Sequence, residues 1–110
     1  DLPIVAIDTA IDSDKVLSFV GFNNEELAAM GGKAAVEAAK AAGWTDIKCI
    51  EIAGVQGDQT NTARMNGYKA GVEEAGGEVV EVQYCDGLAE KAATAMESVM
   101  QMYSYGMLKR

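Results

Sequence analysis

An arginine at the start of a predicted helix is the residue of this chain best placed to bind a ligand. Arg64 lies at the end of a loop, residues 54–64, that connects an apolar run, Ile47–Ala53, to a segment with one apolar stripe of helical spacing. The stripe contains Met65, Tyr68, Val72 and Ala75. The order of strand, loop and helix is half of a βαβ unit, and open α/β sheets bind ligands beyond the carboxyl ends of their strands. We therefore expect Arg64 to face a binding cleft.

The rest of the sequence offers no pattern for catalysis or metal binding. It contains no histidine, which argues against a zinc site and against a histidine-based catalytic triad. The 17 acidic residues include no pair whose spacing and apolar surroundings mark a general acid and base. The loop before Arg64 has glycines and threonines, but neither common nucleotide-binding glycine motif is present. We expect a protein that is not an enzyme and that has no metal and no cofactor.

Charge and hydropathy exclude two classes of partner. Nine basic against 17 acidic residues give a formal net charge of −8, and the basic residues do not cluster. Nucleic acids and anionic membrane surfaces attract proteins with a basic face. No apolar run approaches the length of about 18 residues that insertion across a membrane needs. With 110 residues, 49% of them hydrophobic, the chain is long enough for one core, and we expect residues 1–110 to form a single α/β domain.

The two cysteines are expected to be free. Cys49 lies in the middle of one predicted strand and Cys85 at the carboxyl end of another. In parallel strands of similar register, an offset of about five residues separates the two by a distance on the order of 16 Å. A disulfide needs Cα atoms within about 7 Å of each other.

Apolar runs alternate with helical patterns along the chain. Predicted strands lie at Leu2–Ile7, Val16–Phe22, Ile47–Ala53 and Val79–Tyr84. Helical patterns follow the last three, from Asn23 or Asn24 to Gly43, from about Asn61 to Ala75 and from about Leu88 to Tyr103. Right-handed crossovers then predict a doubly wound, mostly parallel sheet in which the last three strands lie side by side. Gly31 and Gly32 predict close packing of the first helix on this sheet.

The segment after the last helix is too short for another strand and helix. Residues 104–110 leave room for a turn and a very short strand, so the predicted sheet is incomplete and has an unpaired edge. Unpaired apolar edges promote association. We expect the chain to pair with another copy of itself through that edge or by exchanging an element.

Several segments together resemble one family of binding proteins. They are Leu2–Thr9, Phe19–Asn24, the loop Gly57–Arg64 with Asn66-Gly67-Tyr68 after it, and Cys85-Asp86 with Glu90-Lys91-Ala92. In this combination, residues 2–102 are similar to the second lobe of type I periplasmic sugar-binding proteins, the ribose-binding-protein family. The resemblance implies a flavodoxin-like lobe that is only partial, because the first lobe and the last elements of the second are missing.

The resemblance also implies a function. A two-lobed protein of this family closes on a monosaccharide and delivers it to the membrane permease of an ABC-type importer, which implies a periplasmic or extracytoplasmic location. LacI-type regulators use a similar lobe to sense effectors, so an effector-sensing lobe is one alternative. A stand-alone α/β fragment that associates with itself and has no tight ligand is another, because half of a cleft cannot enclose a sugar.

Few ligand positions of the family carry over to this sequence. Asp8 matches a carboxylate that accepts hydrogen bonds from sugar hydroxyls, although it could instead be a turn residue that caps the following amides. Arg64, before Asn66-Gly67-Tyr68, matches an arginine that donates to sugar oxygens, although it could instead form a salt bridge with an aspartate, Asp58 or Asp86. Thr9 stands where ribose binders have an arginine, and Gly87 where many members have an aromatic residue that stacks on the sugar. The predicted sugar-binding residues are Asp8, Thr9 and Arg64.

Overall fold

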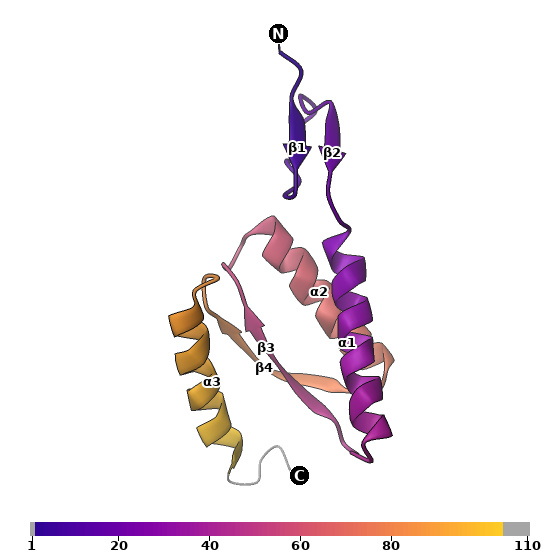
Figure 1. The fold of residues 1–110 in the computed structure, drawn as a ribbon, viewed down its shortest axis with the longest axis vertical. Coiled ribbons are helices and arrows are strands. Elements are labelled where there is room, and N and C mark those ends of the chain that lie inside the picture. Colours follow the sequence, from indigo (N-terminus) through magenta and orange to yellow (C-terminus); the bar gives the residue numbers. More distant parts are fainter. Residues whose placement is uncertain (1, 105–110) are drawn as a thin grey trace.

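The chain folds into a small part and a larger part, shown in Figure 1 by a computed structural model that describes residues 2–104. The small part contains the strands β1 (Val5–Ile7) and β2 (Ser18–Val20). The larger part contains α1 (Asn24–Ala41), β3 (Lys48–Ala53), α2 (Gln59–Glu74), β4 (Glu78–Tyr84) and α3 (Ala89–Ser104). The small part projects beyond the start of α1, so the molecule is elongated, with extents of 60 × 29 × 16 Å. The short strand expected near the C-terminus falls at residues outside those described.

Side-chain caps set the starts of α1 and α2. The side chain of Asn23 accepts a hydrogen bond from the backbone N–H of Glu26 at 3.1 Å. Asp58 accepts one from the N–H of Asn61 at 2.9 Å. Each bond satisfies an N–H group that a helix leaves unpaired in its first turn. The three predicted helices are confirmed, and no end differs from its predicted position by more than two residues.

The strands form two separate pairs. β1 is parallel to β2, with Val5 opposite Ser18, and β3 is parallel to β4, with Ala53 opposite Tyr84. The parallel α/β class is confirmed, but the prediction that Val16–Phe22 lies beside the two later strands is wrong. Residues 8–17, which connect β1 to β2, form a short loop. Closing this short loop costs less conformational entropy than pairing β2 with β3, which follows α1 in the chain.

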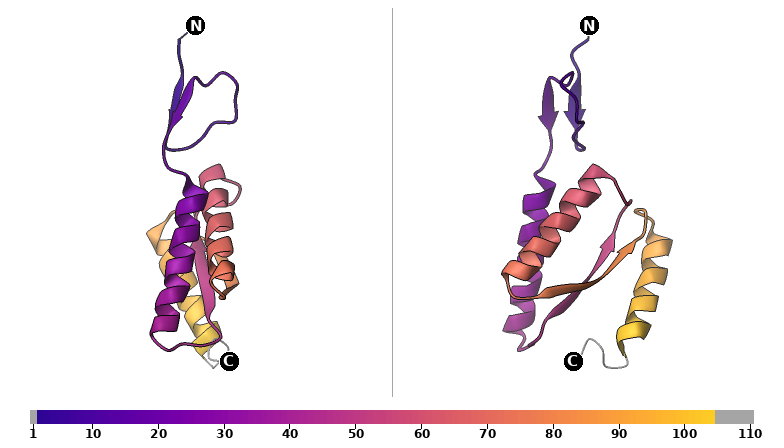
Figure 2. Two further views of the ribbon diagram at one scale, coloured as in Figure 1. Left: turned by 90° about the vertical axis from the view of Figure 1, so that its right-hand side faces the viewer. Right: turned by 180° about the vertical axis from the view of Figure 1, so that it is seen from behind.

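Helices lie on both sides of the β3–β4 pair, as expected for a doubly wound arrangement. α2 contacts both strands and packs closely on α1. α3 also contacts both strands, but within residues 2–104 it contacts neither α1 nor α2. Figure 2 shows α3 and α1 on opposite sides of the strand pair. None of the helices in the described part of the chain is long and apolar enough to cross a membrane.

Glycines bring α1 and α2 together. A Cβ atom built on Gly67 would lie 2.0 Å from the carbonyl oxygen of Glu25, and one built on Gly71 would lie 2.0 Å from that of Ala29. Both distances are far shorter than a van der Waals contact between carbon and oxygen. The absence of side chains at these positions therefore lets the helix backbones touch.

The glycine pair of α1 contacts α2 and not the sheet. A Cβ on Gly32 would lie 2.5 Å from the Tyr68 carbonyl oxygen, whereas one on Gly31 would meet nothing within 4 Å. The prediction that this pair packs on the sheet is wrong, because the backbone of α1 lies close to α2 and not to β3 or β4.

The core lies where α1, α2 and the start of β3 meet. Its buried members are Val36, Ile47 and Val72, and the partly buried side chains of Ala39, Cys49, Tyr68, Ala75 and Val79 pack around them. Cys49 and Cys85 are both free thiols, as expected. Cys49 lies opposite Val79 near the start of the strand pair, whereas Cys85 follows the last residue of β4.

Candidate functional site

Arg64 lines two adjoining grooves. The interhelix groove, of about 620 Å³, lies between α1, α2 and β3, and its lining includes Phe22, Leu27 and Tyr68. The strand-end groove, of about 250 Å³, lies beyond the carboxyl end of β3, and its lining includes Gly54, Asp58, Thr60, Asn61 and Gly87. Glu51, Ile52 and Arg64 belong to both linings. The expectation that Arg64 faces a cleft at the strand ends agrees with this placement.

Asn61 fixes the loop that forms the wall of the strand-end groove. Its side-chain oxygen accepts a hydrogen bond from the N–H of Gly54 at 2.7 Å, and its side-chain nitrogen donates to the carbonyl of Val55 at 2.9 Å. One side chain in the first turn of α2 thus satisfies a donor and an acceptor at the end of β3. The sequence analysis gave Asn61 no role beyond the start of the helix, because its two partners are not identifiable from residue types.

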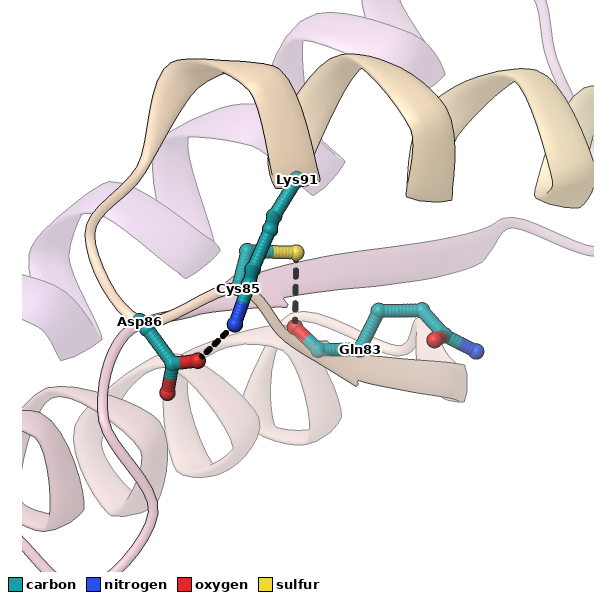
Figure 3. Close-up of polar contacts among 4 residues, drawn as sticks. All are labelled: Gln83, Cys85, Asp86 and Lys91. Carbon is teal, nitrogen blue, oxygen red and sulfur yellow. Dashed lines mark hydrogen bonds and ion pairs between the residues drawn. The ribbon is translucent and has the colours of Figure 1, made fainter.

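Arg64 is held by an amide and not by a carboxylate. Its Nε donates a hydrogen bond to Oδ1 of Asn24, the first residue of α1, at 3.0 Å. Within residues 2–104 it forms no ion pair. The two aspartates considered as its partners are engaged elsewhere: Asp58 caps α2, and Asp86 pairs with Lys91 at 2.5 Å, as Figure 3 shows. The guanidinium therefore keeps donors for a ligand.

Thr9 reaches the same end of α2 from the small part of the molecule. The hydroxyl of Thr60, in the first turn of α2, donates to the hydroxyl of Thr9 at 3.2 Å. Among the described elements, β1 and β2 contact only each other, so this bond ties the loop after β1 to the larger part. Thr9 is not in the lining of either groove that contains Arg64.

Asp8 occupies a strained position at the end of β1. Its φ of +72° lies in the left-handed region, and its N–H donates to the carbonyl of Val20 at 2.9 Å. Within residues 2–104 its carboxylate caps no backbone amide and forms no ion pair, so neither its contact with Arg64 nor the turn-capping alternative is observed.

Gly87 lines the strand-end groove beside Arg64. Its φ is +70°, and a Cβ atom built there would meet nothing within 4 Å. The position at which the resemblance implies a stacking aromatic residue is therefore open and lies on the same groove as Arg64.

Burial changes the acidity of two groups behind Arg64. Burial raises the pKa of Glu51, which lines both grooves. Burial, followed by the nearby Cys49 and Glu51, raises the pKa of the Tyr68 hydroxyl to about 12. That hydroxyl remains protonated at neutral pH and donates to the carbonyl of Ile50 at 3.2 Å. The wall behind Arg64 is therefore anchored by a neutral hydrogen bond.

Replacing Glu51 with glutamine should stabilise the fold at neutral pH but not in acid. Because burial raises the folded-state pKa of Glu51, the native state binds more protons than the unfolded state, and stability falls as the pH rises through that pKa. Urea unfolding midpoints at about pH 4 and about pH 7 test this, since an ordinary glutamate titrates near 4.3. The advantage of Glu51→Gln over the wild type should appear at the higher pH, and the same substitution at the exposed Glu97 controls for loss of one negative charge. A larger advantage in acid would contradict the expectation.

Comparison with known proteins gives a consistent picture. The family model described as a periplasmic binding protein domain matches residues 1–109. Among curated proteins, none matches the sequence. A solved ABC transporter solute-binding protein from Mycobacterium smegmatis with bound glycerol is 34% identical, with a TM-score of 0.77 over 93% of this chain and 34% of that one.

Two more distant structures show the same fold. A solute-binding protein from Burkholderia graminis in complex with D-arabinose is 20% identical, with a TM-score of 0.82 over 94% of this chain and 35% of that one. The fructose-binding periplasmic domain of a hybrid two-component system is 19% identical, with a TM-score of 0.81 over 93% of this chain and 33% of that one. This chain thus spans about a third of the length of each solved structure.

The matches agree with the resemblance found in the sequence. The family and the similar structures consist of solute-binding proteins, several with a sugar named as their ligand. The fold match with the fructose-binding domain covers 93% of this chain. On the family match over residues 1–109, the chain belongs to the periplasmic binding protein domain family.

Proposed function

We propose that this chain supplies part of the monosaccharide-binding cleft of a solute-binding protein that serves an ABC-type sugar importer outside the cytoplasm. The observation that carries the proposal is the placement of Arg64, on two grooves at the carboxyl end of β3, with no carboxylate pairing it among the described residues. In this proposal the chain binds and releases a sugar reversibly, has no catalytic role and delivers its ligand to a membrane permease.

The polar groups around Arg64 suit sugar hydroxyls. The guanidinium offers several N–H donors in a fixed plane, which fits the adjacent oxygens of a sugar. Thr9 and Thr60 have hydroxyls that can donate and accept, and the Asp8 carboxylate can accept two bonds from neighbouring hydroxyls. Asp8 and Thr9 lie on the loop after β1, and Arg64 lies on α2. Binding by all three requires the small part and the larger part to contribute to one cleft.

The isolated chain should bind monosaccharides only in the millimolar range. A pocket usually encloses most of its ligand's surface, and the strand-end groove, of about 250 Å³, is open on one side and lacks a stacking ring at Gly87. Calorimetric titration with D-ribose, D-galactose, D-xylose and D-glucose tests this, with glycerol as a small polyol control. Micromolar binding would show that one lobe suffices, and the absence of heat from every sugar would count against the proposed site.

A second candidate function is self-association of a stand-alone fragment. Large apolar side chains are exposed, notably Leu2, Ile7, Leu17 and Phe22, with exposed fractions of 88, 74, 73 and 71%. β3 pairs only with β4 among the described strands, and its residues Ile50 and Ile52 line the interhelix groove. Exposed apolar strand edges of this kind pair readily with another chain.

If the fragment associates through β3, sedimentation at tens of micromolar should give a dimer. Ile52→Lys should shift the protein to a monomer, because a charged lysine on an edge strand opposes pairing. Val55→Lys, at an exposed apolar residue of the neighbouring loop, is the matched control and should leave the dimer intact. A monomer at every concentration would sink the self-association proposal, and an equal response to both substitutions would place the contact elsewhere.

A further inference from the structure

Asn24 occupies one donor of Arg64 and leaves the others free. A guanidinium has five N–H groups, one on Nε and four on the two Nη atoms. In this chain the Nε–H donates to Oδ1 of Asn24 at 3.0 Å, and the two residues are 40 positions apart in the sequence. Within residues 2–104 no carboxylate pairs with the Nη atoms. The contact thus restrains the guanidinium at Nε and leaves the two Nη atoms without a carboxylate partner among the described residues.

Asn24 is itself held in place by its neighbours. It is half-buried at the start of α1, and its side-chain nitrogen donates to the carbonyl of Phe22 at 3.5 Å. Because an amide has one donor end and one acceptor end, this bond directs the oxygen towards Arg64. The preceding residue, Asn23, uses its own side chain to accept from the N–H of Glu26 and so caps the helix.

The packing of the two helices sets the distance between Asn24 and Arg64. Gly67, one turn after Arg64, touches the backbone of Glu25, the residue after Asn24. Any larger side chain at Gly67 would push the start of α1 away from α2. The backbone contact and the side-chain hydrogen bond therefore lie side by side and support the same arrangement.

We propose that Asn24 is the positioning residue for Arg64, holding the guanidinium by Nε so that its Nη groups are available to oxygen atoms of a ligand in the adjoining grooves. The ligand role rests on the proposed sugar-binding function. An unrestrained arginine side chain loses rotamer freedom when it binds, and a side chain that is already restrained loses less. Asn24 therefore acts through Arg64 and need not touch the sugar.

The direct test is the Nε–H resonance of Arg64 in proton–nitrogen NMR spectra of the ligand-free chain. In the wild type this proton should exchange slowly with water, since it is hydrogen-bonded. Asn24→Ala should remove the slow exchange, and Asn24→Asp, which retains an oxygen acceptor, should restore it. Asn23→Ala is the matched control, because it removes the helix cap and leaves the Asn24–Arg64 contact. Slow exchange that persists in Asn24→Ala would overturn the proposal.

A titration with D-galactose on the same samples tests the ligand role. Loss of one hydrogen bond should weaken the sugar response about three- to tenfold in Asn24→Ala, with no change in Asn23→Ala. Equal weakening in Asn23→Ala and Asn24→Ala would show a merely structural effect and overturn the proposal. If the wild type shows no response to the sugar while Nε–H exchange behaves as expected, the proposed function is wrong, but the inference that Asn24 positions Arg64 is still supported.

Discussion

Gly71→Ala should lower the free energy of unfolding by about 2 kcal/mol, within the range typical of overpacked sites. The new methyl group would lie 2.0 Å from the carbonyl oxygen of Ala29 and 2.8 Å from its carbonyl carbon, so it would meet backbone that cannot move aside without separating the helices. α1 and α2 share the core residues Val36 and Val72, so separating them also exposes the core.

A matched control isolates this contact from helix propensity. Alanine stabilises a helix interior by about 1 kcal/mol over glycine. Gly31→Ala places the same methyl group in α1, where nothing lies within 4 Å, so it should raise stability. Urea unfolding of both variants gives the comparison. A gain in stability at both Gly31 and Gly71 would show that the helices can separate at little cost.

Arg64→Ala should reduce sugar affinity about tenfold or more while leaving the fold intact. A hydrogen bond to a charged group contributes about 1.5–3 kcal/mol, and 1.36 kcal/mol corresponds to a factor of ten. Arg64 is exposed and outside the core, so the free energy of unfolding should change by no more than about 0.5 kcal/mol.

The comparison of Arg64→Ala with Arg64→Lys tests the geometry of the donor. Lysine preserves the positive charge but has no planar fork and no Nε–H to donate to Asn24, so it should recover only part of the affinity. The measurement is a sugar titration of each variant in a protein that contains the complete cleft. Wild-type affinity in Arg64→Ala would remove Arg64 from the site.

The helices could be predicted from the sequence because their signals are local. Asn23, one of the two predicted starts of the first helix, caps α1, and Gly43 follows the C-cap of α1 with a φ of +87°. Asp58 caps α2, whose start was predicted at about Asn61. Each signal depends only on neighbours within about one turn of the chain. The helices therefore begin and end close to their predicted positions.

The pairing of the strands could not be predicted in the same way. An apolar run of Val, Ile and Phe indicates a strand but does not say which other strand it joins, and β2 joins β1 instead of β3. The contact between α1 and α2 was missed for a related reason. No packing role was predicted for Gly67 or Gly71, although their four-residue spacing places both on one face. That spacing was the signal that could have revealed the contact.

The candidate site was predictable only in part. The placement of Arg64 on a groove at the strand end follows from its position after β3 and its loop. Its bond to Asn24 was not predictable, because the two residues are 40 positions apart and meet only when α1 packs on α2. The side chain of Asp8 is not brought to Arg64 by any described contact, so the roles of Asp8 and Thr9 in sugar binding remain predictions.

The junction between the two parts has a mechanical consequence. The small part is attached through the chain from Gly21 to Asn23 and through the hydroxyl pair of Thr9 and Thr60. We expect this junction to bend easily, since among the described elements β1 and β2 lie close only to each other. In solution, an X-ray scattering curve of this protein should therefore report an average over many bend angles.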